Sequence, residues 1–454
     1  MASPPAQTIL RGQVATNDRI ADIQPEHWIS EIYRYESAGT VPMLAIQDRM
    51  PQETTPATVL HWPEQDEATQ FGNVADVYLN ANLSTAYTSG GVVGSVEYIA
   101  MTAAYVKQLN VGDVITIYSP SVGGVGVAGR VENVVVSDDS NSYVAIKLMQ
   151  ADSGPILDNT DLVWFTSSNS HREGAELPDA IAYEPTWYNN HTQIFMASCE
   201  ATGTTMANLE RVSPKYWDRQ VRAALMDLKM KMDWSNIWGV YGTTYENGKP
   251  NRTHMGILEA MRTHLASPYN FFDFQTATTI TGDPFSTAFN GMTWLEGGWT
   301  WFRTVMEIIS RNTKPGTVKQ VYCGPGALEA IARLVESRTN RIWTSEMTEF
   351  GLECTKLSTL SCKLVFMLHP RMVKNTVFHN HAFVTEMRNV HQVMMKGRGL
   401  KFISGMGGDN AEAYTDGYAF VDGRKAGWIC ERSIRWNNLT GFAYLTGLGL
   451  NNTQ

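Results

Sequence analysis

Apolar residues recur at three- and four-residue steps between 213 and 239, in the segment SPKYWDRQVRAALMDLKMKMDWSNIWG. The repeat predicts one long amphipathic helix, with an apolar stripe formed by Trp217, Val221, Ala224, Leu225, Leu228 and Met232. Ser213 is a good N-cap and Pro214 suits the first turn, while Gly239 is expected to end the helix in the left-handed conformation. About 25 helical residues at ~1.5 Å each would make a rod of roughly 37 Å.

Short β-branched runs follow one another between 85 and 170, separated by clusters of Gly, Pro, Asn and Asp. Their spacing is typical of a small antiparallel barrel or sandwich. The flanking segments, 54–84 and 171–205, contain extended runs that we expect to pair as a long hairpin. Because strands so far apart can pair only if the chain between them folds separately, the barrel is predicted to be an insertion.

After the long helix, the pattern alternates between helical and extended periods, which predicts a mixed α and β domain. Helices are predicted over 254–265, 299–312 and 325–338, and strands over 317–324 and 363–370. Two further extended segments, 386–396 and 424–438, are expected to pair as a hairpin beside the long helix.

Composition narrows the function classes only partly. Of the 454 residues, 18% are charged and 13 are Trp, against roughly 25% charged residues in typical domains. Interface cores are poor in charge and rich in aromatics, so the composition fits either extensive subunit contacts or a large aromatic core. The net charge of −9 argues against a general nucleic-acid binder. It does not exclude a shell around DNA, because such a wall needs little affinity for its contents.

Cysteine usage and the first residues indicate the compartment. Five dispersed cysteines without a C-x-x-C pair indicate free thiols in a reducing environment. The start, MASPPAQTILRGQ, has neither the basic nor the apolar region of a signal peptide, and no apolar run reaches the ~20 residues needed to cross a bilayer. We therefore expect synthesis in the cytoplasm and no membrane partner.

The segment EGAELPDAIAYEPTWYNNHTQIF…ATGT…KYWDRQVRAALMDLKMKMDWSNIWG resembles the major capsid proteins of tailed bacteriophages. A looser likeness continues through VYCGPGALEAIARLV and KLVFMLHPRM to CERSIRWNNLTGFAYLTG. The resemblance implies an α+β fold of the Hong Kong ninety-seven type. Its parts would be an N-terminal arm, an extended loop, a spine helix and a mixed α/β domain, here with an inserted antiparallel β-barrel.

The resemblance also implies a division of the chain. Its predicted parts are an N-terminal arm (1–53), an extended-loop hairpin (54–84 and 171–205), the inserted barrel (85–170), a peripheral domain with the spine helix 213–239 (206–242 and 385–439), and an axial domain (243–384 and 440–454).

The function implied by the resemblance is mechanical. Many copies would form hexamers and pentamers of an icosahedral shell that encloses double-stranded DNA, assembled in the host cytoplasm and retained in the virion. Portal, scaffold or decoration proteins would be further partners. Two alternatives remain: a bacterial nanocompartment shell protein, and a cytoplasmic carbohydrate-active hydrolase suggested by the many Trp residues and carboxylates.

No catalytic, cofactor-binding or metal site is predicted. His379 and His381 lie near each other, but no carboxylate or thiol stands at a recognisable ligand spacing. The stretch 323–326 lacks the Lys-Ser/Thr of a P-loop, and 405–410 is not followed by the helix N-terminus that a nucleotide loop needs. Both are expected to be turns.

The residues expected to matter are structural. Trp217, Trp234 and Trp238 are predicted to fix the long helix against its sheet, and Trp187 and Phe195 to anchor the hairpin on a neighbouring copy. The basic segment 371–401 includes Lys396, Arg398 and Lys401, whereas acids dominate residues 1–80. This segment is predicted to meet the acidic arm of a neighbour or DNA phosphates, or else to be an ordinary mixed-charge surface.

Overall fold

The computed structural model describes residues 42–454 apart from gaps at 51, 66–68, 123–125, 153, 155, 203, 206–215, 284, 315, 340–346, 350–351, 360–361 and 407–422. Most of the predicted N-terminal arm, and the predicted helix start at Ser213 and Pro214, therefore lie outside the described residues. The chain forms two compact units. One runs up to Trp62 and resumes at Tyr188, and the other is Pro63–Trp187.

The Pro63–Trp187 unit is built on one antiparallel sheet of seven strands, in the order β3-β9-β6-β7-β8-β5-β4. The strands are β3 (Phe71–Asn73), β4 (Asp76–Tyr78), β5 (Val96–Ala100), β6 (Asp113–Tyr118), β7 (Val127–Val135), β8 (Tyr143–Leu148) and β9 (Val163–Asn169), with the short helix α2 (Ala103–Val106) after β5. Ile117, Val131 and Trp164 form part of a core of its own. The sheet begins before the predicted boundary at residue 85. The prediction missed β3 and β4 because strands of three residues each are too short to show an alternating pattern.

The other unit contains a mixed seven-stranded sheet, in the order β14-β23-β19-β15-β18-β17-β16. Its strands are β14 (Phe271–Asp273), β15 (Val318–Cys323), β16 (Met347–Glu349), β17 (Leu352–Ser358), β18 (Lys363–Leu368), β19 (Ala382–Thr385) and β23 (Ala443–Thr446). Helices α6 (Trp294–Ile308) and α7 (Pro325–Thr339) contribute to a core shared with this sheet, which includes Trp301 and Phe366. A capping box between Thr293 and Glu296 starts α6 five residues before the predicted position, 299.

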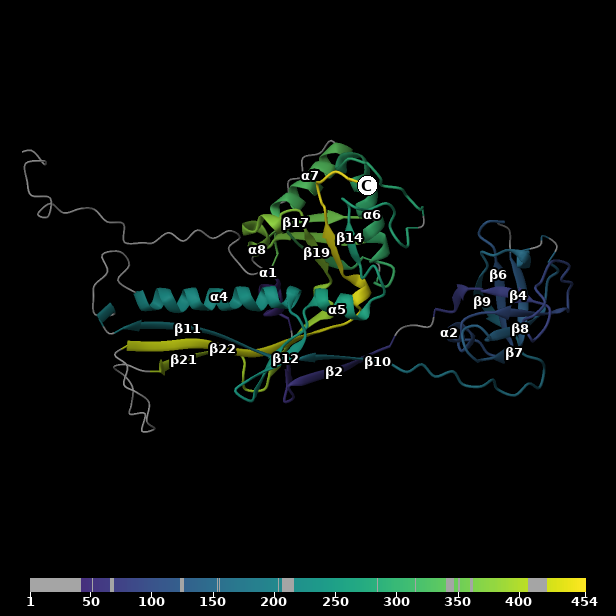
Figure 1. Cartoon of the computed structure of the whole chain (residues 1–454), viewed down its shortest axis with the longest axis horizontal. Helices are drawn as coiled ribbons and strands as arrows, with labels where there is room; N and C mark the ends of the chain where they lie inside the picture. Colours follow the sequence, from purple (N-terminus) through teal and green to yellow (C-terminus); the bar gives the residue numbers. More distant parts are fainter. Residues whose placement is uncertain are drawn as a thin grey trace, which may run out of the picture. The chain divides into compact units, whose positions relative to one another are not determined.

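A second sheet in this unit runs β1-β20-β22-β11, with β21 also paired to β22. Its strands are β1 (Glu53–Thr55), β11 (Gln193–Thr202), β20 (Val390–Met395), β21 (Lys401–Met406) and β22 (Gly423–Trp436). The predicted hairpin of 386–396 with 424–438 is confirmed, since β20 pairs antiparallel with β22 from Val390↔Trp436 to Met394↔Arg432. The long helix α4 (Tyr216–Trp238) lies along β11 and β22 (Figure 1).

The prediction that Gly239 ends the helix in the left-handed conformation is wrong. The helix does end at Trp238, but Gly239 is not among the glycines with positive φ. A Cβ on Gly239 would stand 2.5 Å from the Ser235 carbonyl oxygen and 2.7 Å from that of His254. Glycine is needed because two backbones meet there, and the Gly256 amide donates to the Gly239 carbonyl at 2.8 Å.

Extended segments and short helices complete the fold. β2 (Val59–Glu64) pairs with β10 (Thr186–His191), as predicted for the long hairpin, and β12 (Gly242–Glu246) pairs with β13 (Lys249–Thr253). The remaining helices include α1 (Pro42–Gln47), α5 (Ile257–His264) and α8 (Pro370–Lys374). The described residues contain no helix with the length and apolar character to span a membrane. The predicted α+β fold class is confirmed, with its order of extended hairpin, spine helix, mixed domain and final strand.

Candidate functional site at the long helix

The two halves of α4 are buried to different degrees. No residue between Tyr216 and Asp227 is fully buried. In the second half, Leu228, Met232, Asp233, Asn236 and Ile237 are all buried. Two of these five are polar, so the second half must satisfy their hydrogen bonds inside the protein.

A small cluster of buried residues joins α4 to its sheet. Leu228 and Met232 pack with Phe195 of β11, Cys430 of β22 and Leu44 of α1. Nearer the start of the helix, the Trp428 indole N–H donates to the Val221 carbonyl at 3.2 Å. The helix is therefore fixed to β11 and β22 by buried apolar residues of its second half and by the Trp428 contact with its first half.

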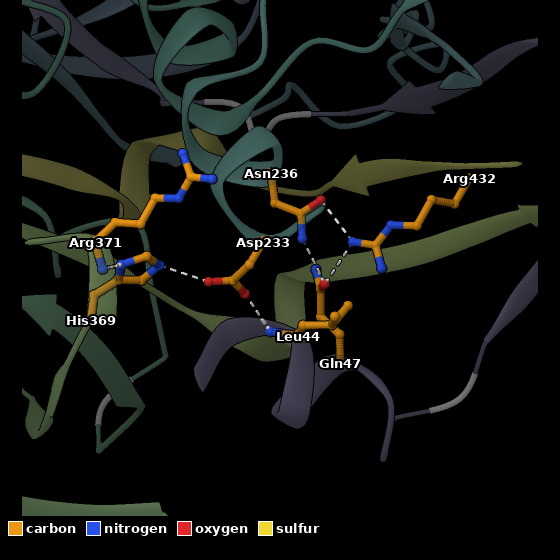
Figure 2. Close-up of polar contacts among 7 residues, drawn as sticks. All are labelled: Leu44, Gln47, Asp233, Asn236, His369, Arg371 and Arg432. Atoms are coloured by element: carbon orange, nitrogen blue, oxygen red, sulfur yellow. Dashed lines mark hydrogen bonds and ion pairs between the residues drawn. The ribbon is translucent and has the colours of Figure 1, made fainter. Parts of the chain in front are cut away.

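Asp233 lies at the centre of a buried polar junction (Figure 2). One carboxylate oxygen accepts from the Leu44 amide at 2.7 Å, and the other is 2.7 Å from Nε2 of His369. Nδ1 of His369 accepts from the Arg371 amide at 3.3 Å. A neutral imidazole with its proton on Nε2 satisfies both contacts, so we assign this tautomer to His369. Asp233 and His369 are both fully buried.

One helical turn further, Asn236 links α4 to α1 and β22. Nη2 of Arg432 donates to the Asn236 side-chain oxygen at 2.8 Å, and lies 3.4 Å from the Gln47 side-chain oxygen. The Asn236 amide donates to the same Gln47 oxygen at 2.9 Å. Arg432 is 1% exposed, and burial lowers its pKa, an effect that the charge of Asp233 opposes. The buried guanidinium is thus held by amide oxygens and by a nearby carboxylate.

His254 closes the end of the helix. It is fully buried, and its Nε2 lies 3.3 Å from the Ser235 hydroxyl. Burial, with the nearby charge of Arg432, lowers the pKa of His254 to about 3. His254 is therefore neutral near pH 7.

These contacts make the junction a structural link between elements of one chain. The carboxylate and the guanidinium are each bound to groups fixed within the same chain, and they join α1, α4, α8 and β22. Within the described ranges, no three His, Cys, Asp or Glu side chains are grouped so that they could hold a metal ion.

Trp234 and Trp238 make ring contacts with residues outside the sheet of β11 and β22. Trp234 lies 5.5 Å from Phe378 and 5.2 Å from His369, measured between ring centroids. Trp238 lies 5.5 Å from Tyr444 of β23. Both therefore hold the helix to the α8 region and the seven-stranded sheet, and their role in fixing the helix against its sheet stays a prediction. Trp217 is partly exposed in the first half of the helix.

Phe195 and Trp187 are placed in different environments. Phe195 is 6% exposed and lies on the face of β11 that is turned toward α4. Its burial within the chain does not fit the predicted contact with a neighbouring copy. The opposite face of β11 instead exposes Ile194 and Met196. Trp187, which is 66% exposed, keeps its predicted interface role as a proposal.

The three predicted basic residues lie in or beside the turn between β20 and β21, and all are exposed. Arg398 pairs with Glu431 of β22 at 2.6 Å, and this carboxylate also accepts from the Thr192 hydroxyl at 2.9 Å. The charge of Arg398 therefore secures the turn within its own chain. Lys401 donates to the Gly397 carbonyl at 2.6 Å, and Lys396 is exposed.

Sequence reasoning missed the polar junction. Its members come from α1, α4, β22 and the start of α8, and Gln47 and Arg432 are 385 positions apart. One signal was present: Asn236 follows Leu228 and Met232 at four-residue steps and so continues the apolar stripe. A polar residue on a buried stripe needs an internal partner.

Two sequence comparisons match this chain to major capsid proteins. The model of a family described as SU10 major capsid protein matches residues 11–405. A major capsid protein of Pseudomonas phage PaMx41 is 24% identical over 299 residues, which cover 64% of this chain and 66% of that protein. The chain thus spans just under two thirds of that relative's length.

Solved structures show more distant similarity. A chain from Mycobacterium phage Bobi is 9% identical with a TM-score of 0.41, over 96% of this chain and 99% of that one. The capsid structure of Cyanophage P-SCSP1u is 14% identical with a TM-score of 0.39, over 63% of this chain and 81% of that one.

Proposed function

Because this chain belongs to the SU10 major capsid protein family, we propose that its copies assemble into hexamers and pentamers of an icosahedral shell around double-stranded DNA. The role is mechanical, with no cofactor and no catalysis. The protein would be part of the virion after assembly in the host cytoplasm, together with portal, scaffold or decoration proteins.

The observation that carries this proposal is the apolar surface of the extended segments. Leu177 is 96% exposed, and Trp187 and Met196 are each 66% exposed. Interface cores are enriched in large apolar and aromatic side chains, so each of these exposed side chains is a candidate for contact with another copy. Contacts with other copies would bury these side chains, and the partly exposed first half of α4 offers further surface.

The buried junction supports the same function. A shell subunit that occupies several environments needs one part that keeps its shape while other parts adjust. Asp233, Asn236 and Arg432 tie the second half of α4 to α1 and β22 through contacts that lie wholly inside one chain. This region would therefore keep its shape in pentamers and hexamers alike.

Contact with DNA would be weak and non-specific. The net charge is −9, and only a few cations in the β20–β21 region face solvent. Lys396 and Lys401 are candidates for phosphates or for the acidic arm of a neighbour, whereas Arg398 is engaged with Glu431. Such contacts would weaken with salt, because exposed charges are screened.

The test is expression of the full chain followed by sedimentation and negative-stain electron microscopy. We expect rings or closed shells, with a separate scaffold protein added if the chain requires one. A monomer under all these conditions would contradict the proposal. Particles that enclose proteins and exclude DNA would favour the nanocompartment alternative, and turnover of a polysaccharide by a monomer would favour the hydrolase.

A further inference from the structure

Asn190 in β10 uses its whole hydrogen-bonding capacity inside the protein. The side chain is fully buried. Its nitrogen donates to the Ile434 carbonyl at 2.9 Å and to the Met255 carbonyl at 3.1 Å. Its oxygen accepts from the Met255 amide at 2.7 Å and from the His191 amide at 2.8 Å. Because a side-chain amide offers two donors and two acceptor lone pairs, Asn190 ties β10 to β22 and to the segment before α5 with all of them.

Aromatic side chains hold both strands of the extended hairpin at the same place. Trp62 of β2 packs edge-on against Trp436 of β22, with ring centroids 4.9 Å apart. Tyr188 of β10 packs against His264 of α5, also at 4.9 Å. Trp62 and Trp436 are at most 3% exposed. The two strands are therefore anchored on β22 and α5 by apolar packing as well as by hydrogen bonds.

Residues 58–62 and 188–192 form the root of the hairpin, and all of them belong to the larger compact unit. Thr192 joins the two strands of the root, because its amide donates to the Thr58 carbonyl at 2.9 Å. The Thr192 hydroxyl donates to the buried carboxylate of Glu431 at 2.9 Å. The root is therefore cross-linked within itself and to β22.

The chain that leads into β10 is exposed, in contrast to the root. Residues 171–185, all of which are described, contain no helix or strand. From 171 to 187, every residue except Ile181 is exposed. Segments with few buried contacts open at a lower free energy than buried ones. Movement of the hairpin is therefore expected beyond the root and not within it.

We propose that Asn190 is a positioning residue that fixes the direction in which the extended hairpin leaves the larger compact unit. This inference rests on the proposed shell function, in which copies of the chain occupy several environments. The root keeps one geometry in every copy, and residues 171–187 adjust between environments.

Asn190→Asp tests this role in the full-length chain. The variant keeps the shape of the side chain but loses the donors to two buried carbonyls, so the root should open. Hydrogen exchange of amides 188–192 should become about tenfold faster or more, while amides 228–238 of α4 keep their protection. Particles of this variant should lose the uniform diameter expected of the unmodified chain, because the hairpin no longer leaves in one direction.

The matched control is Asn189→Asp, an exposed neighbour in β10, which should leave exchange and particle diameter unchanged. Thr192→Val is a second test if Asn190→Asp does not fold. It keeps the side-chain volume, removes the hydroxyl bond to Glu431, and should speed exchange of the root amides by roughly threefold.

The outcomes separate this inference from the proposed function. If the unmodified chain forms shells, but the root variants match Asn189→Asp in exchange and in particle diameter, the inference fails and the proposed function stands. Faster exchange throughout the chain, α4 included, would give Asn190 only a general stabilising role and would also overturn the inference. So would faster exchange at the root with particles of unchanged diameter. If the unmodified chain never assembles, both fail.

Discussion

The two halves of α4 differ in what holds them. From Leu228 to Trp238 the helix is fixed by a buried carboxylate, a buried guanidinium and two tryptophans, all within one chain. From Tyr216 to Asp227 no residue is fully buried. One continuous helix therefore combines a half that is anchored by buried residues with a half whose residues are half-buried or exposed. In a subunit that must both keep its shape and contact other copies, different halves of one helix can serve these two roles.

Removal of Asp233 should have the largest effect on stability. Asp233→Ala leaves the Leu44 amide and His369 without their acceptor and removes a charge near buried Arg432. Loss of one member of a buried charged cluster costs about 3–5 kcal/mol. Chemical denaturation followed by tryptophan fluorescence measures the change. The control is Asp227→Ala, at an exposed position in the first half of α4, which should change the free energy of unfolding by less than about 0.5 kcal/mol. Equal effects at the two positions would remove the contrast between the halves.

Gly239→Ala should have the second-largest effect on stability. The new methyl group would stand 2.5 Å from the Ser235 carbonyl oxygen and 2.7 Å from that of His254. Overpacking of this kind costs about 1–3 kcal/mol, because the backbones must move apart. At Gly242 the nearest atom to an added Cβ is 3.4 Å away, so Gly242→Ala serves as the control. If thermal denaturation showed the same stability for both variants, the close approach at the helix end would not be important.

His254 should make the anchored end sensitive to acid. Its pKa is lowered to about 3 in the folded protein, against about 6.5 for an ordinary histidine. Below about pH 6.5 the unfolded chain binds a proton that the folded chain does not, so stability is full above this pH and falls toward pH 3. The slope is at most about 1.4 kcal/mol per pH unit. Denaturation at several pH values should show this slope, and His254→Gln should flatten it. An unchanged slope in the variant would assign the acid sensitivity to other groups.

The smallest effect on folding is expected for exposed cations of the β20–β21 region. The double variant Lys396→Gln with Lys401→Gln should change the free energy of unfolding by less than about 0.5 kcal/mol. Arg398→Gln should lower the free energy of unfolding more, because it leaves buried Glu431 without its ion pair. If the two lysines contact phosphates or an acidic arm, their neutralisation should lower particle yield at low salt. Normal yield at every salt concentration would show that these lysines belong to an ordinary mixed-charge surface.

The sequence predicted elements more successfully than contacts. Apolar periodicity located α4, and β-branched runs located β15, β18 and the β20–β22 hairpin, because these patterns depend on neighbours in the chain. The junction of Asp233, Asn236 and Arg432 could not be predicted in this way. Its partners meet only after the sheet and α1 are in place, and polar residues on a helix usually face solvent.

Gly239 and Phe195 also show that contacts between distant segments cannot be predicted from local patterns. Gly239 marked the helix end correctly, but its role depends on Gly256, which approaches only in the folded chain. Phe195 was predicted to anchor the hairpin on a neighbouring copy. Which face of β11 packs on α4 is decided by register, and that register places Phe195 inside.

Hydrogen exchange along α4, measured before and after assembly, tests the central claim most directly. Amides from 228 to 238 should be protected in both states, because the junction is complete in one chain. Amides from 216 to 227 should exchange faster in the unassembled chain and gain protection in shells, since neighbouring copies would cover them. Equal protection of the two halves before assembly, or no gain in the first half after it, would contradict the account.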